Sequence, residues 1–497
     1  GSLASGSGSV SQLAAGTGVA GALWVGLGGG TFANAGVQAD NIGVAFVSDG
    51  TGTSGLGALA LGTLGLTVRG TVYRLATASL SASSLALGAV RVGGTLGTTA
   101  LQITNAASGD GYSDLLSVGN GGGGGSGFVL QGGGGTVSAG GSVSFGVGFS
   151  GATTQSGVLS GVLSVPLLSV GQAGTGLGSV ALGTQSVAVS AGVYQPAVGA
   201  LAYGGSVLAA GGSVDLGATR AGVPFAGSAL LDVRNIAEGA VGFVEGLKAT
   251  GNALGYGSVS GSVSLLAAGG TQAGGFTVGL GSAAAVGAGL KSGTVQVLFE
   301  TDGTGTSGLA NTSAGTQSVQ VYGRVYRVAT GSLLAGGSAL VEGAVVKLGA
   351  IREGGSFALS ALEVRNVAES SDGYSEKLNA SFAGGGTLAS GSGSVLQLSA
   401  GGSVSGAMWV GLGSGTFASA GLQTGSVGVA FASDGTGTSG LGALAVGTLN
   451  LGVQGTVYRL ATASLSASSI SLGVIRSGGS LGFGALAVSN TAGTDGY

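Results

Sequence analysis

The clearest pattern along the chain is an alternation of apolar and polar residues with a period of two. In the stretch from Leu64 to Val72 the apolar side chains share one parity, and Thr67, Arg69 and Thr71 occupy the other. Such alternation predicts a β-strand with one buried face. Matching apolar positions recur at Val319, Val321, Val325, Leu449, Leu451, Val453 and Val457.

Glycine-rich turns separate these stretches at intervals of roughly ten to fifteen residues, and no convincing helical pattern lies between them. Units with about seven short strands of this kind are typical of antiparallel β-sandwiches. We therefore predict an all-β protein built of tandem antiparallel β-sandwiches.

Internal repetition divides the chain. The segment from Gly70 to Ser84 recurs without change from Gly455 to Ser469, 385 residues later (455 − 70 = 385). An Asp-Gly-Thr-Gly-Thr-Ser-Gly-Leu loop occurs three times, and a degraded fourth copy surrounds Gly174. Fixed periods of this kind indicate an array of similar structural units.

Three markers recur in each unit. A Val-Tyr pair comes first, then a Leu-Gly-x-x-Arg-x-Gly turn, then a strand that ends in asparagine. The tyrosines are Tyr73, Tyr194, Tyr326 and Tyr458; the arginines are Arg91, Arg220, Arg352 and Arg476; the asparagines are Asn105, Asn235, Asn366 and Asn490.

Together with the Asp-Gly-Tyr-Ser-Glu-Lys-Leu-Asn-Ala-Ser-Phe string that begins at Asp372, these markers resemble the choice-of-anchor D repeat proteins. Those are large bacterial surface proteins with ASH-type, immunoglobulin-like modules. The resemblance covers essentially the whole chain and implies seven-stranded sandwiches, export and a surface role. It carries no catalytic residues. The unit from Val198 to Thr330 departs from the pattern because it reads Val241-Gly-Phe243.

The resemblance also places the domain borders. We expect complete sandwiches at 78–197, 198–330 and 331–462, an incomplete one at 1–77 that lacks its first strands, and the first strands of a further sandwich at 463–497. The last segment supplies what 1–77 lacks, except for a piece matching Ser375 to Thr387. Because a half sandwich exposes unpaired edges, either the polypeptide continues at both ends or one copy completes the next by strand addition. Head-to-tail completion that does not close on itself gives a filament.

Composition narrows the function. Only 7% of the 497 residues are charged and the net charge is −3, which argues against binding to nucleic acid or to an anionic membrane. Between Asp114 and Asp215 no charged residue occurs, and a surface with so little charge favours association. No run of eighteen strongly apolar residues occurs, so we expect membrane attachment, if there is any, through an anchor outside this segment.

Motifs for chemistry are missing. Without histidine or cysteine, a Ser-His-Asp triad, a thiol nucleophile and a disulfide are excluded. The glycine content makes G-x-G-x-x-G matches expected by chance, and no phosphate-binding G-x-x-x-x-G-K-[ST] motif is present. We expect no catalytic residue, no cofactor site and no small-molecule substrate.

A calcium site is the one metal alternative, with Asp49, Asp302 and Asp434 as weak candidates in the repeated loops. Each loop supplies one carboxylate, whereas calcium sites usually have two or more. An Asp-Gly turn, in which the aspartate caps local amides, is the preferred interpretation.

Other repeated polar and aromatic residues have structural interpretations. The repeated arginines are expected at sandwich rims, bonded to turn carbonyls or to scarce carboxylates, with an acidic or carbohydrate partner as the alternative. A Lys–Asn isopeptide bond is disfavoured because Asn105 and Asn490 have no lysine in their segments. Trp24 and Trp409 are expected to fill a core or groove, rather than to form a sugar platform.

The sequence therefore predicts a non-enzymatic protein, secreted or at the cell surface, that self-associates into a filament, sheath or matrix. The alternative is a spacer stalk of a large adhesin.

Overall fold

A computed structural model describes residues 3–122, 126–132, 134–386 and 388–497, which form β-strands and one short 3₁₀-helix. The expected all-β class is confirmed. Gly1 and Ser2 of the expected 1–77 unit, and Thr387 at the end of the piece matching Ser375 to Thr387, lie outside the described residues.

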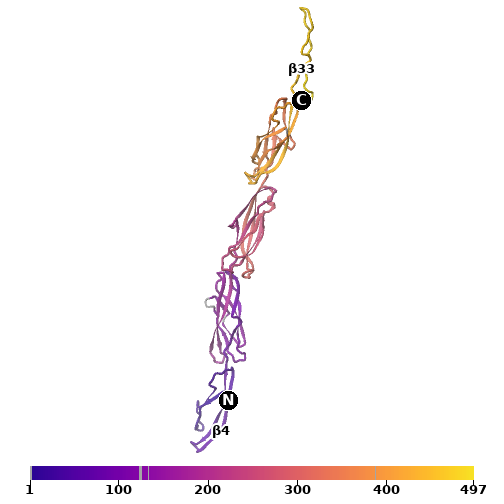
Figure 1. Cartoon of the computed structure of the whole chain (residues 1–497). Coiled ribbons are helices and arrows are strands. Elements are labelled where there is room, and N and C mark those ends of the chain that lie inside the picture. The colour runs from indigo at the N-terminus through magenta and orange to yellow at the C-terminus, as the bar shows by residue number, and fades with distance from the viewer. Residues whose placement is uncertain (1–2, 123–125, 133, 387) are drawn as a thin grey trace.

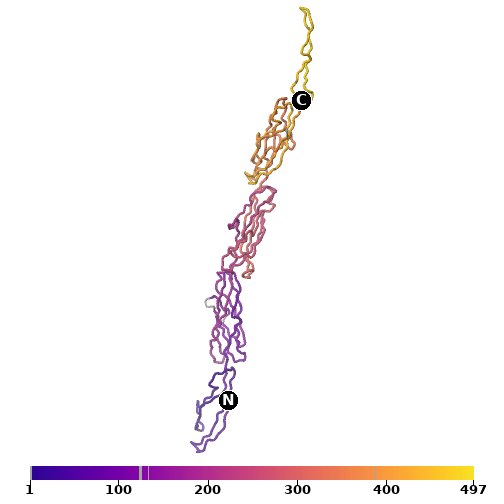
Figure 2. Tube along the Cα trace, viewed as in Figure 1, coloured from indigo at the N-terminus to yellow at the C-terminus, as the bar shows by residue number. Residues whose placement is uncertain are grey.

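The sandwiches follow one another end to end and give a long, narrow molecule (Figure 1). Residues 3–77 occupy one end, with the indigo strands, and the yellow segment 463–497 projects from the opposite end. The tube view shows the same arrangement, with a single chain crossing between successive units (Figure 2).

The first complete sandwich contains nine described strands in two sheets, ordered β10-β8-β12-β13-β6 and β5-β7-β11-β9. Leu101, Ile103, Leu163 and Val187 lie between the sheets without measurable exposure. The strands are β5 (Ala78–Leu80), β6 (Ser84–Arg91), β7 (Thr99–Asn105), β8 (Leu115–Val118), β9 (Phe128–Gln131), β10 (Gly135–Val137), β11 (Ser142–Phe149), β12 (Gly157–Val170) and β13 (Ser179–Tyr194).

The second sandwich has two five-stranded sheets, β15-β14-β17-β21-β19 and β16-β23-β22-β18-β20. Its core includes Leu231, Phe276 and Val319. The elements are β14 (Gly199–Tyr203), β15 (Ser206–Val207), β16 (Ser213–Arg220), β17 (Ala229–Asn235), β18 (Gly246–Gly255), β19 (Gly257–Ser260), β20 (Ser262–Leu266), β21 (Thr271–Leu280), η1 (Ser282–Ala285), β22 (Gly289–Asp302) and β23 (Thr312–Tyr326).

In the third sandwich the two layers are joined through β29, which pairs with both β28 and β30. The result is one continuous order, β25-β24-β27-β30-β29-β28-β31-β32-β26. The strands are β24 (Gly331–Ala335), β25 (Ser338–Leu340), β26 (Val345–Arg352), β27 (Ser360–Asn366), β28 (Lys377–Gly385), β29 (Ala389–Leu398), β30 (Ser403–Leu412), β31 (Gly421–Asp434) and β32 (Leu444–Tyr458).

One pairing differs from the expected antiparallel pattern. The strands that carry Arg91, Arg220 and Arg352 each pair in parallel with the last strand of their own sandwich: β6 with β13, β16 with β23 and β26 with β32. A parallel pair needs a long connection between its strands, and here the rest of the sandwich provides it. This pairing places each arginine beside the Val-Tyr tyrosine at the end of its sandwich.

The predicted alternation buries one face in the complete sandwiches, but not in residues 3–77. Leu451 and Phe431 of the third sandwich are 1% and 7% exposed, whereas their counterparts 385 residues earlier, Leu66 and Phe46, are 46% and 44% exposed. The strands here are β1 (Ala4–Ser7), β2 (Trp24–Leu27), β3 (Gly36–Gly50) and β4 (Leu56–Val72), and β3 and β4 form a sheet of two strands.

Residues 463–497, at the other end of the chain, also expose side chains that a complete sandwich buries. They contain the short strands β33 (Ala463–Leu465) and β34 (Val488–Asn490), which pair with each other. Val488 is 74% exposed, whereas Ile103, its counterpart 385 residues earlier, is fully buried. Both end segments therefore expose side chains that complete sandwiches bury.

The expectation that Trp24 and Trp409 fill a core or groove is wrong. Trp409 alternates with the buried Met408 and Val410 on β30, so its side chain points outwards and is 38% exposed. Trp24 is more exposed still. The period of two along the strand decides the direction of the indole, and ring size does not.

Candidate functional site: the junctions between sandwiches

An aromatic pair lies at every junction. The tyrosine of each Val-Tyr marker faces the aromatic residue of the next unit's Asp-Gly-Tyr position. The ring centroids are 6.1 Å apart for Tyr73 and Tyr112, 5.1 Å for Tyr194 and Phe243, 5.5 Å for Tyr326 and Tyr374, and 6.4 Å for Tyr458 and Tyr497. Tilted pairs at these distances attract beyond the apolar area that they bury. Phe243 thus keeps the contact although its unit departs from the Asp-Gly-Tyr pattern.

A second contact is an exposed ion pair. In three junctions the arginine after the tyrosine reaches the aspartate of the next Asp-Gly-Tyr, over 2.7 Å for Arg74–Asp110, 2.5 Å for Arg327–Asp372 and 2.6 Å for Arg459–Asp495. Hydrogen bonds from Arg74 and from the Tyr112 amide lower the pKa of Asp110. Partly exposed pairs of this kind contribute about 0–1 kcal/mol each.

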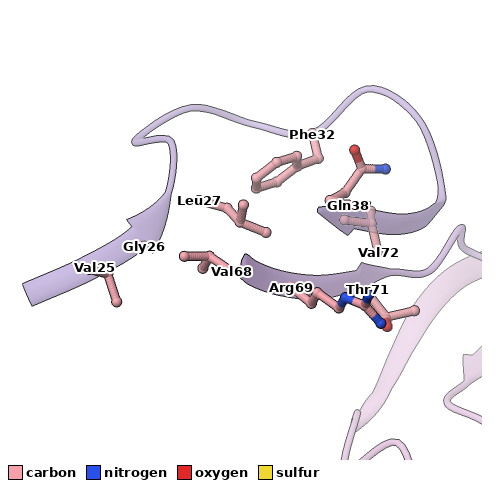
Figure 3. Close-up of a pocket in the computed structure, with 10 residues that line it drawn as sticks. Val25, Gly26, Leu27, Phe32, Gln38, Val68, Arg69, Thr71 and Val72 are labelled. Carbon is pink, nitrogen blue, oxygen red and sulfur yellow. The ribbon is translucent and has the colours of Figure 1, made fainter. Parts of the chain in front are cut away.

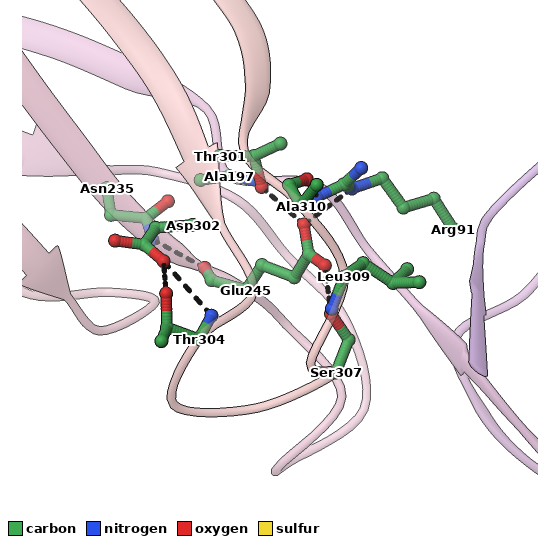
Figure 4. Close-up of polar contacts among 10 residues, drawn as sticks. All are labelled: Arg91, Ala197, Asn235, Glu245, Thr301, Asp302, Thr304, Ser307, Leu309 and Ala310. Atoms are coloured by element: carbon green, nitrogen blue, oxygen red, sulfur yellow. Dashed lines mark hydrogen bonds and ion pairs between the residues drawn. The ribbon is translucent and has the colours of Figure 1, made fainter. Parts of the chain in front are cut away.

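The third contact is buried and charged. The Nε of Arg91, in the first complete sandwich, donates to Oε2 of Glu245, in the second, over 2.7 Å (Figure 4). Nη2 of Arg91 donates to the carbonyl of Ala310 over 2.7 Å. The Glu245 side chain is fully buried. Arg91 therefore bonds a carboxylate and a carbonyl of the next sandwich at once.

Hydroxyl groups complete the surroundings of Glu245. Thr301 donates to Oε2 over 2.6 Å, and Ser307 donates to Oε1 (Figure 4). The Thr301 hydroxyl in turn accepts a hydrogen bond of 2.9 Å from the amide of Ala197 in the linker. Since both carboxylate oxygens are bonded, the cost of burying this charge is offset.

The next junction repeats this arrangement. Arg220 Nε donates to Oε2 of Glu376 over 2.8 Å, while Ser433 and Ser439 each donate to the carboxylate over 2.6 Å. Arg220 also donates to the carbonyl of Gly442. Two successive junctions therefore have the same buried arginine–glutamate contact, which fixes one sandwich on the next.

Two of the repeated asparagines form hydrogen bonds with the backbone that carries the buried glutamates. Asn235 Nδ2 donates to the carbonyls of Glu245 and Leu266, and Asn366 does the same to Glu376 and Leu398. In both residues Oδ1 accepts hydrogen bonds from backbone amides. Each amide side chain thus fixes the backbone that carries the buried carboxylate.

The calcium candidates are Asx turns in the structure. Oδ1 of Asp49, Asp302 and Asp434 each accepts from the amide and hydroxyl of the threonine two residues later. These bonds lower all three pKa values, that of Asp434 to about 2, because Asn379 and Gln397 also donate to it. No group of three or more acidic residues that could hold a metal ion is found in the described part of the chain.

A groove lies in the N-terminal segment. It has a volume of about 490 Å³ and is lined by residues of β2, β3 and β4 and the loop between β2 and β3, including Leu27, Phe32, Val68 and Gly70. Leu27, Phe32 and Val68 face the same space (Figure 3). In the third sandwich the corresponding space is filled by Phe357, which packs against Gly455 and stacks edge-on on Phe417 at 5.1 Å.

The sequence anticipated part of this site. The expected bonds from the repeated arginines to turn carbonyls and carboxylates are confirmed for Arg91 and Arg220. That these partners belong to the next sandwich was not predicted. The signal was present: an acidic residue, Asp114, Glu245 or Glu376, lies two positions after the junction aromatic in each complete unit.

A scan of protein-family models gives no match to this chain, and a search of curated proteins gives none either. Among the described residues, no helix is long and apolar enough to cross a membrane.

Solved structures give distant likenesses. A protein of unknown function from Porphyromonas gingivalis W83 is 12% identical over 50% of this chain and 99% of its own, with a TM-score of 0.20. The ASH/PapD-like domain of human CEP192 is 10% identical over 24% of this chain and 87% of its own, with a TM-score of 0.18. Cadherin domains 1–5 of protocadherin gamma B2 are 10% identical over 84% and 66%, with a TM-score of 0.32. All three TM-scores are below 0.5, so these likenesses carry no argument about function.

Proposed function

We propose that this protein is a structural, non-enzymatic component of a bacterial cell surface, secreted from the cell, and that it assembles head to tail into a filament, sheath or matrix. One observation carries the proposal: segments 3–77 and 463–497 expose apolar side chains that belong to complementary parts of one sandwich, which together lack the strand that corresponds to β28. The resemblance of the repeat markers to choice-of-anchor D proteins supports the surface location. The scarcity of charge supports lateral packing.

The complementarity extends to individual positions. Segment 463–497 repeats 78–112 at the 385-residue offset, and segment 3–77 repeats 388–462 at the same offset. Within the first sandwich, 78–112 supplies β5, β6 and β7, which bury Leu87, Leu101 and Ile103. The counterparts Leu472, Leu486 and Val488 are exposed. Placing 463–497 on β2–β4 of a second copy buries both apolar faces.

The groove beside Gly70 indicates how segment 463–497 of one copy aligns with β4 of the next. In the second and third sandwiches the residue five positions after the repeated arginine, Phe225 or Phe357, packs against the glycine of the last strand, Gly323 or Gly455. In segment 463–497 that residue is Leu481. We assign Leu481 of one copy to the groove of the next, against Gly70.

The two segments lie at opposite ends of the molecule (Figure 1). Because a donor at one end and an acceptor at the other cannot meet within one extended copy, completion adds copies in a line. Self-association is thus the partner interaction that we propose, without nucleic acid or a small-molecule substrate.

The test is the assembly state of the full chain, by sedimentation velocity and electron microscopy. We expect filaments whose length grows with concentration. Leu481→Asp should abolish them, because a carboxylate would enter an apolar groove. Val474→Asp is the matched control, since its counterpart Ala350 is exposed in the third sandwich. A chain that stays monomeric at high concentration, or equal effects of both substitutions, refutes the proposal.

A spacer stalk of a large adhesin is the second candidate, favoured by the two buried arginine–glutamate junctions, which stiffen the row of sandwiches. A stalk acts as a spacer and does not need to self-associate. A monomeric, rigid chain in solution scattering would select it over the filament.

A further inference from the structure

Asp114 is a buried carboxylate with one oxygen unpaired. Its side chain lies where β8 begins and the residue is 4% exposed. Oδ2 accepts a hydrogen bond of 2.8 Å from Ser169, whereas Oδ1 has no partner among the described residues. An unpaired buried carboxylate oxygen is costly. The position therefore lacks a donor.

The position of Asp114 is that of Glu245 and Glu376. The Asp114 amide donates to the Arg74 carbonyl over 2.9 Å, as the Glu245 amide does to Gln195 and the Glu376 amide to Arg327. Ser169 occupies the place of Thr301 and Ser433. Asp114 thus has the same backbone hydrogen bond and the same hydroxyl donor as the buried glutamates of the other two junctions. What it lacks is an arginine partner.

The direction from which that arginine must come is fixed by strand pairing. Arg91 and Arg220 lie beside Tyr194 and Tyr326, each on a strand that runs parallel to the last strand of its own sandwich. At the first junction the corresponding tyrosine is Tyr73, just after β4. In the described structure β4 pairs with β3 alone, so the edge that would receive an arginine-bearing strand is open.

We propose that the Asp114 carboxylate binds the guanidinium of Arg476 from a second copy of this chain. Arg476 stands in the same Leu-Gly-x-x-Arg-x-Gly turn as Arg91 and Arg220. When segment 463–497 completes the N-terminal segment of the next copy, the register seen for Arg91 and Tyr194 sets Arg476 beside Tyr73. This inference rests on the proposed head-to-tail assembly and names the ion pair that locks it.

The surroundings of Asp114 fit a guanidinium better than another donor. At Glu245 the second carboxylate oxygen is bonded by Ser307; at Asp114 the equivalent loop residue is Thr175, whose hydroxyl donates to the Gln172 carbonyl instead. Oδ1 of Asp114 therefore lacks the hydroxyl donor that Oε1 of Glu245 has, whereas Oδ2 keeps its serine partner and is the counterpart of Oε2, the oxygen to which Arg91 donates. Gly178 stands in the place of Ala310, whose carbonyl accepts from Arg91 Nη2. A guanidinium has donors for both sites at once, and an ammonium does not match that fork.

The experiment is a double-mutant cycle on the assembly of the full chain, read as the association constant between copies. Asp114→Asn and Arg476→Gln should each weaken association roughly 100-fold, since each leaves a buried charge or dipole unpaired. The double variant should be no weaker than either single variant. Arg476→Lys should not restore association, and Asp114→Glu, which matches the other junctions, should preserve it. Circular dichroism of each variant confirms that the sandwiches are folded.

Arg91→Gln is the matched control, because it removes the same contact from a junction inside one chain and should leave association between copies unchanged. If the effects of Asp114→Asn and Arg476→Gln are additive in a chain that still assembles, the proposed ion pair is wrong and the proposed filament is not affected. A wild-type chain that remains monomeric overturns the ion pair and the filament together.

Discussion

Arg91 and Glu245 are 154 residues apart in sequence, yet their side chains meet at 2.7 Å across the border between two sandwiches. The contact exists because β6 runs parallel to β13 and ends level with Tyr194, so the arginine leaves its own sandwich and enters the next one. A residue whose backbone belongs to one unit thus satisfies a carboxylate buried in another. The junction is therefore part of the fold of both units.

Arg91→Gln should loosen this junction without unfolding either sandwich. It leaves the fully buried Glu245 without its cation, and breaking a buried pair in this way costs about 3–5 kcal/mol. The amides of Gln195 and Glu245 bond across the junction, to Phe243 and Gln195 respectively. We expect their hydrogen exchange to become faster by a factor on the order of 100.

Arg324→Gln is the control for that measurement, because its ion pair with Asp215 is exposed on both sides and contributes about 1 kcal/mol or less. Exchange at Gln195 and Glu245 should not change in this variant. Equal protection in wild type and Arg91→Gln would mean that the arginine does not hold the junction.

The Asp434 turn should make the third sandwich sensitive to acid. Hydrogen bonds from Thr436, Asn379 and Gln397 lower the folded pKa of Asp434 from 3.8 to about 2. Because the folded pKa is the lower one, the turn stabilises the fold fully above the unfolded pKa, and this stabilisation is lost as pH falls from about 4 towards 2. Asp434→Asn should therefore lower the urea midpoint at pH 7 and change it little near pH 2.

Trp409 on β30 can report this transition in a Trp24→Phe background, since the chain has two tryptophans. Asp49→Asn is the matched control: the same turn lies in the N-terminal segment, so the Trp409 transition should not move. A loss of stability from Asp434→Asn that is the same at both pH values would contradict the role of the carboxylate charge.

Much of the fold follows from local pattern. Alternation such as that around Val321 predicts strands with one buried face, because side chains on a strand point to opposite sides. The repeated markers are also in contact with one another, as Tyr326 is with Tyr374. These features depend on residues close in sequence or on repetition, and both can be read from a single chain.

What the sequence did not predict depends on contacts between distant segments. The parallel pairing of β6 with β13 is set by how the whole sandwich closes, and without it the reach of Arg91 into the next unit cannot be foreseen. The size of the Trp409 ring favours a buried place, but its position on β30, between the buried Met408 and Val410, turns it outwards. The unpaired oxygen of Asp114 is likewise visible only once Ser169 and Thr175 are placed around it.

A C-terminal extension should strengthen assembly further. Segment 463–497 matches the strands that precede β28, but β28 itself has no counterpart in it. In the third sandwich β28 pairs with both β29 and β31. A second copy completed by 463–497 alone therefore lacks one central strand, and its neighbours keep unpaired edges.

The variant carries the sequence of residues 375–385 directly after Tyr497, the counterpart of Tyr374. It would supply the missing strand and, at the position of Glu376, a carboxylate for Arg352, which has no ion-pair partner among the described residues. We expect longer filaments and assembly at lower concentration, by sedimentation and electron microscopy. An extension with the glutamate changed to alanine should restore the strand but not the ion pair, and a scrambled extension should do neither. If the scrambled extension promotes assembly as well as the native one, the sandwich is not completed by pairing in register, and the head-to-tail mechanism fails.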